Sequence, residues 1–245
     1  MKKYFIAILM FLTPNLILRQ LLKLLRIKVG KNFKIGFSIL ISNKISITDD
    51  VTIGHFNFIN IDNIQMMDKC YIRFLNIING PFDLIMRKQA AIGKFNLITR
   101  SKKPITSGYS KLDLGILVKI NSFHFLDLTK SIIVGDYSTF AGLRTQVWTH
   151  GYVHDYEGIS RYRIDGEVNI GNNVYVGAGS IINSGVTICD SVILGAGSFV
   201  SKNIDSKGLY TPVNPKKILS NYFDIKDTLI KTKNPVEDVY ERLSQ

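Results

Sequence analysis

The chain has little cysteine, little proline and no long unbroken apolar run. Its 245 residues include 2 Cys and 6 Pro. Cys70 and Cys189 are far apart and belong to no spaced set, which argues against a disulfide framework and against a thiolate metal site. We expect no bound metal. Because no Ser/Pro-rich linker is present, one elongated domain with terminal appendages is the simplest organisation.

Acidic residues are also few. The 31 Lys and Arg outnumber the 19 Asp and Glu, which gives a net charge of +12. This balance favours an anionic partner, such as a phosphate-bearing cofactor, an acidic glycan or a membrane surface. The basic residues are spread along the chain and accompany no recognition-helix pattern and no aromatic nucleic-acid motif. Nucleic acid is therefore not an expected partner.

A six-residue repeat dominates the second half of the chain. Six consecutive hexads run from residue 170 to residue 205, and each opens on a branched aliphatic residue. Neither a helix nor an alternating strand has this period. A hexapeptide period is a signature of a parallel β-helix, in which each hexad forms one short strand and one turn. The residues expected to point into the lumen are Ile170, Val176, Ile182, Ile188, Leu194 and Val200.

The same repeat runs over residues 29–64, and a coil-sized pattern fills the middle of the chain. Four similar segments there follow one another after 19, 20 and 28 residues, and the longest interval indicates an insertion at roughly 101–111. We expect one internal polar column with a structural role: Asn57, Asn76, Asn96 and His124. Outward aromatic residues of the same segments predict an apolar stripe of the kind that marks a protein interface: Phe56, Phe58, Phe95, Phe123 and Phe125.

The two ends of the chain lie outside the repeat. In residues 1–28, Lys2 and Lys3 precede an apolar run that ends before Pro14, and a basic amphipathic stretch follows. No small-residue cleavage site follows the run, and it is too short to span a bilayer. A helix that caps the coil stack is favoured over a helix on the membrane surface, and both can hold together. We expect the β-helix to occupy residues 29–219, and residues 220–245 to form an extension with a short closing helix over 236–243.

The longest break in the repeat, residues 148–169, is where we expect the chemistry, because long loops on a rigid scaffold usually carry function. His55 should face solvent and His124 belongs to the internal column, which leaves His150 and His154. An imidazole titrates near neutrality and can accept a proton from an acceptor hydroxyl. His150 is the preferred base because it follows directly on a coil edge; a surface histidine with no catalytic part is the alternative. The acid that orients it stays open among Asp136, Asp155, Glu157 and Asp165.

Three segments carry a family resemblance: VWTHG at 147–151, YRIDGEVN at 162–169 and IGNNVYVGAGSIINSGVTI at 170–188. They resemble the hexapeptide-repeat acyltransferases, in particular the sugar O-acetyltransferases of bacterial capsule, exopolysaccharide and lipopolysaccharide assembly. The resemblance implies an all-β fold built on a left-handed parallel β-helix, and a homotrimer with its active sites between chains. It also implies a cytoplasmic enzyme, which would contact the inner face of the membrane if its N-terminal segment binds there.

The resemblance also implies a reaction and its residues. Acetyl-CoA would donate the acetyl group to a sugar hydroxyl that attacks the thioester directly, with His150 as the general base. The implied cofactor contacts are Gly177, Ala178, Gly195, Ala196, Lys202 and Lys217. The acceptor sugar would meet Arg144, Trp148 and His154. An N-acetyltransferase acting on an amino sugar and a non-catalytic β-solenoid scaffold are the alternatives. A zinc hydratase is disfavoured because it would need three histidine ligands, and a nucleotidyltransferase because the chain has no nucleotide-binding domain.

Overall fold

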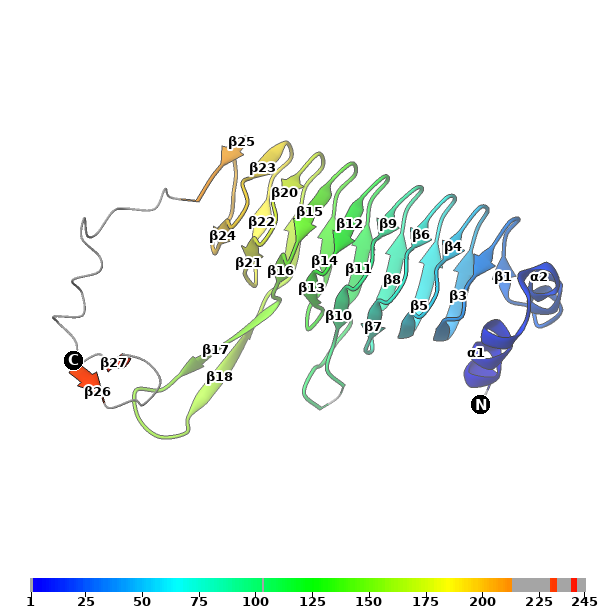
Figure 1. The fold of residues 1–245 in the computed structure, drawn as a ribbon, viewed down its shortest axis with the longest axis horizontal. Helices are drawn as coiled ribbons and strands as arrows, with labels where there is room; N and C mark the ends of the chain where they lie inside the picture. The colour runs from blue at the N-terminus through cyan, green and yellow to red at the C-terminus, as the bar shows by residue number, and fades with distance from the viewer. Residues whose placement is uncertain (1, 103, 213–229, 233–238, 242–245) are drawn as a thin grey trace. The chain divides into compact units, whose positions relative to one another are not determined.

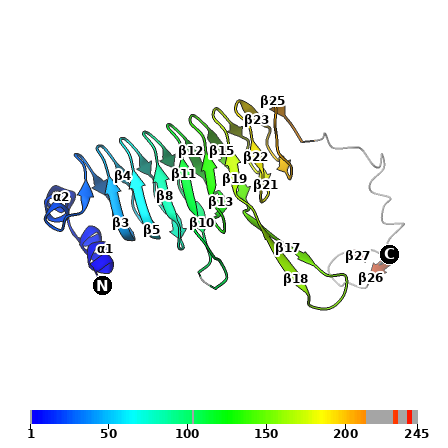
Figure 2. The same ribbon diagram turned by 180° about the vertical axis from the view of Figure 1, so that it is seen from behind.

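The computed structural model describes residues 2–102, 104–212, 230–232 and 239–241. The chain divides into two units, residues 1–212 and residues 213–245. The first unit is a parallel β-helix with two helices at its N-terminal end (Figures 1 and 2). This confirms the predicted all-β solenoid.

Each coil of the β-helix visits three faces in the same order. The first face is a nine-stranded parallel sheet. Its strands are β2 (Lys34–Ile35), β4 (Thr52–Ile53), β6 (Tyr71–Ile72), β9 (Ala91–Ile92), β12 (Lys119–Ser122), β15 (Thr139–Leu143), β20 (Tyr175–Val176), β23 (Val192–Leu194) and β25 (Gly208–Tyr210).

The second and third faces belong to one continuous sheet, because the long strands β3 (Ile39–Ile47) and β5 (Phe58–Met66) bend from one face onto the other. The second face continues with β7 (Ile77–Asn79), β10 (Leu97–Thr99), β13 (Phe125–Asp127), β16 (Gln146–Val147), β21 (Ile181–Ile182) and β24 (Phe199–Val200). The third face also holds β1 (Lys28–Val29), β8 (Asp83–Met86), β11 (Lys111–Leu114), β14 (Ile132–Val134), β19 (Val168–Ile170) and β22 (Thr187–Ile188).

The aliphatic residues that open the hexads fill the lumen, as predicted. Ile170, Val176, Ile182, Ile188, Leu194 and Val200 are all buried and belong to one hydrophobic cluster that runs through the stack. Burial of such side chains is the main favourable term in folding. Each coil therefore stabilises its neighbours, and the coil spacing sets which residues of different coils lie above one another.

The predicted polar column is present inside the stack. Asn57, Asn76, Asn96 and His124 are all buried. The Oδ1 atom of Asn57 accepts hydrogen bonds from the Nδ2 of Asn76 at 2.9 Å and from its backbone N–H at 3.0 Å, and Asn76 accepts from Asn96 in the same way. The backbone N–H of His124 donates to Asn96 at 2.9 Å. The column thus satisfies the polar groups that the coils bury.

Burial lowers the pKa of His124 to about 4, while its Nδ1 accepts a hydrogen bond from the backbone of Thr145. The unfolded chain, with a histidine pKa of about 6.5, therefore binds more protons than the folded chain between these values, and stability falls as the pH falls through this window. We expect this residue to cost about 2 kcal/mol of unfolding free energy between pH 7 and pH 5. Urea unfolding at both pH values should show a smaller loss for His124→Asn, which can extend the column. An equal loss in both proteins would contradict the expectation.

Two helices close the N-terminal end. Helix α1 (Lys2–Leu12) lies against β3, and α2 (Asn15–Leu24) follows after Pro14. Ile6, Met10, Leu18 and Leu22 are buried and join the hydrophobic cluster of the coils. The segment is therefore a cap, which was the favoured prediction. Among the described residues, no helix combines the length and apolar character needed to cross a bilayer.

The closing helix predicted over 236–243 is wrong where the structure describes this segment. Residues Val239–Glu241 form a strand, β27, which pairs antiparallel with β26 (Ile230–Thr232). Val239 and Tyr240 are residues that favour strands, and backbone pairing with β26 prevails over the local helical pattern. Residues 236–238, 242 and 243 lie outside the described residues, as does the predicted end of the β-helix at 213–219.

Candidate functional site

Two insertions leave the coils at the corner between the second and third faces. The first occupies residues 100–110, between β10 and β11, which agrees with the predicted insertion at roughly 101–111. The second is the predicted loop 148–169. It forms an antiparallel hairpin of β17 (His150–His154) and β18 (Arg161–Asp165) that projects from the stack (Figures 1 and 2).

Arg163 joins the hairpin to the first insertion. Its guanidinium forms a bidentate ion pair with Asp165, at 2.6 and 2.8 Å, and donates a third hydrogen bond to the carbonyl of Ile105 at 2.6 Å. Arg100 stabilises the first insertion, because its guanidinium donates hydrogen bonds to the carbonyls of Ser107 and Gly108, each at 3.0 Å. Both insertions are thus anchored near the base of the hairpin.

His150 lies at that base and is held by an aspartate. Its Nδ1 lies 2.8 Å from Oδ2 of Asp127, the last residue of β13 in the coil below. A carboxylate can only accept a hydrogen bond, so Nδ1 carries the hydrogen, and in the neutral form of the ring Nε2 holds a free lone pair. The His150 side chain is 26% exposed and that of Asp127 is 8% exposed. The geometry therefore provides a base whose orientation is fixed from the protein side.

Hydrogen bonds keep Asp127 charged although it is buried. Burial raises its pKa, but hydrogen bonds from His150, Thr129 and Thr149 outweigh that effect and hold the pKa below its ordinary value. The Thr129 hydroxyl donates to Oδ1 at 2.9 Å, and the Thr149 backbone N–H donates to Oδ2 at 3.0 Å. The carboxylate therefore stays ionised and can stabilise a positive charge on His150.

Aromatic side chains surround the imidazole. The ring of Trp148 lies 6.1 Å from that of His150 and packs at 4.6 Å against Phe125, so the predicted acceptor residue Trp148 is beside the predicted base. Tyr152 lies edge-on at 5.9 Å on the other side. His154 is exposed at the far end of β17, paired across the hairpin with Arg161 and 6.5 Å from the Tyr152 ring. The structure thus brings Trp148 to His150 and leaves His154 further out.

The predicted Gly-Ala contacts lie at a different corner. Gly177–Ala178 and Gly195–Ala196 follow β20 and β23, at the corner between the first and second faces. Arg144 is exposed at this same corner after β15 and is separated from His150 by β16. Within one chain, the second face therefore separates these residues from His150.

Gly177 also has a packing reason to be glycine that the sequence argument did not foresee. A Cβ atom there would lie 2.6 Å from the backbone nitrogen of Ala196 and 2.6 Å from the carbonyl oxygen of Leu194 in the next coil. The equivalent atom at Gly195 would meet nothing closer than 3.4 Å. Close stacking of the coils thus requires glycine at residue 177 but tolerates a small side chain at residue 195.

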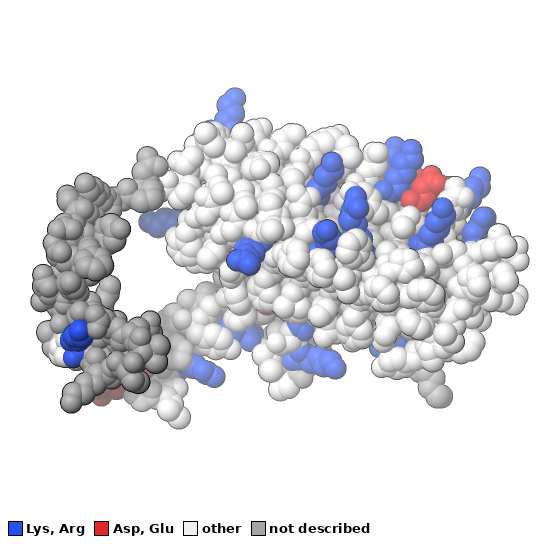
Figure 3. All heavy atoms as spheres, in the orientation of Figure 1, with Lys and Arg blue, Asp and Glu red and all other residues white. Residues whose placement is uncertain are grey.

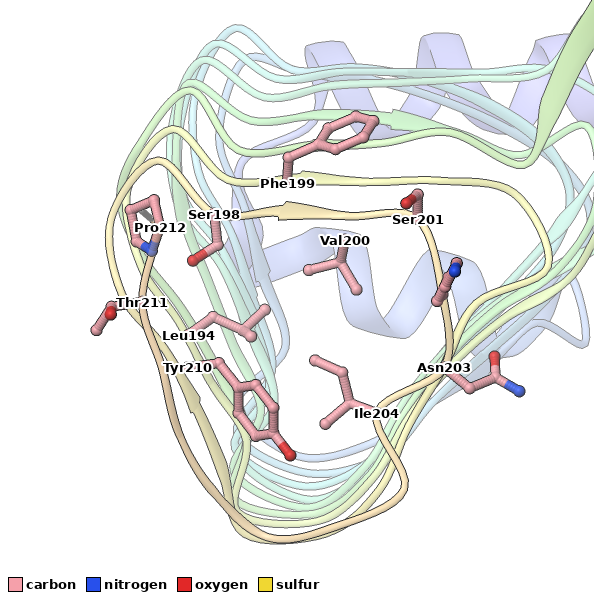
Figure 4. Close-up of a pocket in the computed structure, with 11 residues that line it drawn as sticks. Leu194, Ser198, Phe199, Val200, Ser201, Asn203, Ile204, Tyr210, Thr211 and Pro212 are labelled. Carbon is pink, nitrogen blue, oxygen red and sulfur yellow. The ribbon is translucent and has the colours of Figure 1, made fainter. Parts of the chain in front are cut away.

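Lys202 is exposed after β24, at the corner between the second and third faces, and not at the corner that carries the Gly-Ala pairs. It lines a pocket at the C-terminal end of the coils, into which the lumenal side chains of Leu194, Val200 and Ile204 point (Figure 4). Lys217 lies outside the described residues.

Asp127 is the site residue that the sequence reasoning missed, since it considered only acids on the coil of His150 or in its loop. The signal was the coil spacing. Strand β13 pairs in parallel with β16, with Leu126 opposite Val147, so Asp127 falls opposite Trp148, two residues before His150. An acid 23 residues before His150 therefore comes within reach of it. Within the described ranges, no three His, Cys, Asp or Glu side chains gather to hold a metal.

A scan of family models matches residues 167–202 to the family described as bacterial transferase hexapeptide (six repeats). The chain carries the hexapeptide repeat of the bacterial transferases. This match and the coil architecture confirm the hexapeptide repeat and the parallel β-helix that the sequence predicted. No relative was found among curated proteins.

The solved structures to which this chain is similar include three acyltransferases. The polySia-specific acetyltransferase NeuO is 14% identical, with 89% of this chain and 81% of NeuO covered and a TM-score of 0.41. The N-acyltransferase AntD from Bacillus cereus, in complex with dTDP-4-amino-4,6-dideoxyglucose and coenzyme A, is 19% identical, with 85% and 93% covered and a TM-score of 0.34. A maltose O-acetyltransferase from Clostridium difficile 630 is 15% identical, with 99% and 88% covered and a TM-score of 0.28.

Proposed function

We propose that the protein is an acetyl-CoA-dependent O-acetyltransferase that modifies a sugar in a bacterial capsule, exopolysaccharide or lipopolysaccharide pathway, in the cytoplasm. The observation that carries the proposal is the Asp127–His150 pair, whose 2.8 Å contact leaves the imidazole Nε2 free at the base of the hairpin. A neutral imidazole held in one orientation by a charged carboxylate is the arrangement that general-base catalysis requires.

In the proposed reaction, Nε2 of His150 takes the proton of the acceptor hydroxyl as its oxygen attacks the acetyl carbonyl. A carbon–oxygen bond forms, the carbon–sulfur bond of the thioester breaks, and the proton passes from His150 to the departing thiolate. The positive charge that His150 carries between the two transfers is stabilised by Asp127. No residue of the chain needs to form a covalent bond, and the products are an acetyl ester and free coenzyme A.

The corner between the first and second faces suits a slender acyl donor in its last coils. Bulky residues with positive φ occupy this corner in the earlier coils, as at Phe56, Phe95 and Phe123, whereas Gly179 and Gly197 take the same position later. A side chain other than glycine costs about 1–2 kcal/mol in this conformation. A Cβ atom at Gly179 or Gly197 would meet nothing within 4 Å, and Ala196 is exposed. The backbone of these coils is therefore exposed and carries only small residues, which supports binding of the acyl donor along it. Arg144 is available to bind a phosphate group of the donor.

A homotrimer would complete the site. His150 and the Gly-Ala corners belong to opposite edges of the second face, so a neighbouring chain is needed to bring a donor edge to each histidine. One row of outward side chains on that face is apolar, with Ile39, Phe58, Ile77, Leu97 and Phe199 each at least 37% exposed. The predicted Phe stripe continues it, since the rings of Phe95 and Phe123 stack at 4.6 Å. A contiguous apolar face of this kind favours burial between subunits.

The first test is the release of thiol from acetyl-CoA with a panel of acceptors: free sugars, nucleotide-linked sugars, lipid-linked oligosaccharides and amino sugars. We expect release that depends on a hydroxyl acceptor. Release with an amino sugar alone, and an amide product, would replace the proposal with the N-acetyltransferase. A lack of release with every acceptor and every acyl donor would favour the non-catalytic scaffold.

The shared site has its own test. His150→Ala removes the base, and Ala196→Trp fills the donor edge, so each variant alone should be inactive. Co-expression of the two gives mixed trimers in which about a quarter of the clefts combine an intact histidine with an intact edge. We expect that share of wild-type activity to return. Failure to recover activity in a trimer of confirmed mass would show that base and edge act within one chain.

A further inference from the structure

The N-terminal helices expose more apolar surface than a cap requires. Helix α1 buries Ile6, Ala7 and Met10 against the coils. Its opposite side would be polar in an ordinary surface helix, but no charged residue occurs from Tyr4 to Leu12. That side exposes Tyr4, Phe5, Ile8, Phe11 and Leu12, each by 39–70%. In Figure 3 the surface around α1 is largely uncharged.

Helix α2 adds to this surface. Leu18 and Leu22 are buried, whereas Leu16 is 89% and Leu24 is 80% exposed. Single exposed apolar residues are normal, but a helix such as α1 that is apolar on both its buried and its exposed side is not. On α2, the exposed leucines lie among the exposed polar residues Gln20 and Lys23. The capping role therefore does not account for the exposed apolar residues of α1 and α2.

Cationic side chains gather beside the exposed helix. A pocket near the start of α1 is lined by Lys2, Lys3, Arg26, Lys28 and Lys44, and no acidic residue is among its lining residues. Such a pocket suits phosphate groups. A second copy of this chain would bring the same positive charges together, so self-association at this end is unfavourable. An apolar helix face bordered by lysine and arginine instead matches a lipid surface that carries negative charge.

We propose that the exposed sides of α1 and α2 dock this protein on an anionic lipid bilayer. The apolar side chains of α1 enter the boundary between headgroups and acyl chains, and the five cations of the pocket bind lipid phosphates. Docking requires neither an acyl donor nor a sugar. It can therefore be tested independently of the proposed acetyl transfer. Its consequence is that the enzyme works next to acceptors held in the membrane.

The test is sedimentation of the full chain with phosphatidylcholine vesicles that contain, or lack, phosphatidylglycerol. We expect binding to the anionic vesicles alone. The double variants Phe5→Glu with Ile8→Glu and Lys2→Glu with Lys3→Glu should each lower the partition at least about ten-fold. Lys69→Glu with Lys88→Glu makes the same charge change away from α1 and should keep most of the binding. Thermal unfolding must show that all variants fold.

Three results would overturn the proposal. Equal binding of wild type to uncharged vesicles would exclude a role for the cations. Unchanged binding of the Phe5 and Ile8 variant would mean that charge alone attracts the protein to the vesicles, as it would to any polyanion. The apolar side of α1 would then take no part in binding. A lower molar mass of that variant in size-exclusion chromatography with light scattering would identify the exposed side of α1 as a contact between copies of the chain.

Discussion

Replacement of His150 by glutamine is expected to lower kcat by about 10²- to 10⁴-fold, the range that a positioned general base contributes. Glutamine has a similar length and can still donate a hydrogen bond to Asp127, but its amide cannot accept a proton from the acceptor. The KM for acetyl-CoA should change little, because the predicted donor contacts lie on other coils. Steady-state measurement of thiol release separates the two parameters.

A control variant removes a histidine that takes no part in the proposed chemistry. His55→Gln is the matched control, since His55 is exposed at an early coil and should leave kcat unchanged. Full activity of His150→Gln would remove the proposed mechanism.

Replacement of Asp127 by asparagine is expected to have the next largest effect, a loss in kcat of about 10²-fold or more, with about 10⁴-fold as the upper limit known for an aspartate behind a catalytic histidine. Asparagine keeps the shape of the side chain but loses the charge, and its amide can present a hydrogen to Nδ1. His150 would then adopt its other tautomer, in which Nε2 carries the hydrogen. The nitrogen that faces the acceptor could therefore not act as a base. Asp127 acts through His150, so it is a positioning residue.

The charge on Asp127 also affects how the stability of the fold depends on pH. Its folded-state pKa lies below the ordinary value, so it stabilises the fold above about pH 3.9, and this contribution is lost as the pH falls through the folded pKa. Acid unfolding of Asp127→Asn should therefore depend less steeply on pH below about 4 than that of wild type. Asp190→Asn, which changes an exposed carboxylate on another corner, should keep full activity. Equal activity of Asp127→Asn and wild type would contradict the positioning role.

The fold was predictable because its signal repeats. One hexad has little information, but the same inward aliphatic position recurs in coil after coil, and the structure buries it each time. The Asn57–His124 column was found in the same way, because coils that stack in parallel align equivalent residues. The closing helix failed for the opposite reason, since residues 239–241 belong to no repeat and backbone pairing overrode a weak local pattern.

The site was predictable only in part. His150 followed from the break in the repeat, but its partner comes from a different coil, where Asp127 is the last residue of β13. Locating it required the exact length of the coil between β13 and β16, and a sequence pattern leaves that length uncertain by a residue or two. The same uncertainty applies to Lys202, which lies at a corner other than that of the Gly-Ala pairs. Proximity along the chain is thus a poor guide to proximity in a solenoid.

Both insertions leave the coils at one corner, and the strands on either side of each keep their pairing with the coils above and below. A change in the length of either segment therefore does not alter the alignment of the stack. Acceptor preference can diverge there by exchange of whole loops while the core stays the same. Transfer of a hairpin from a homologue into positions 148–167 is accordingly a practical way to test whether this segment selects the proposed acceptor.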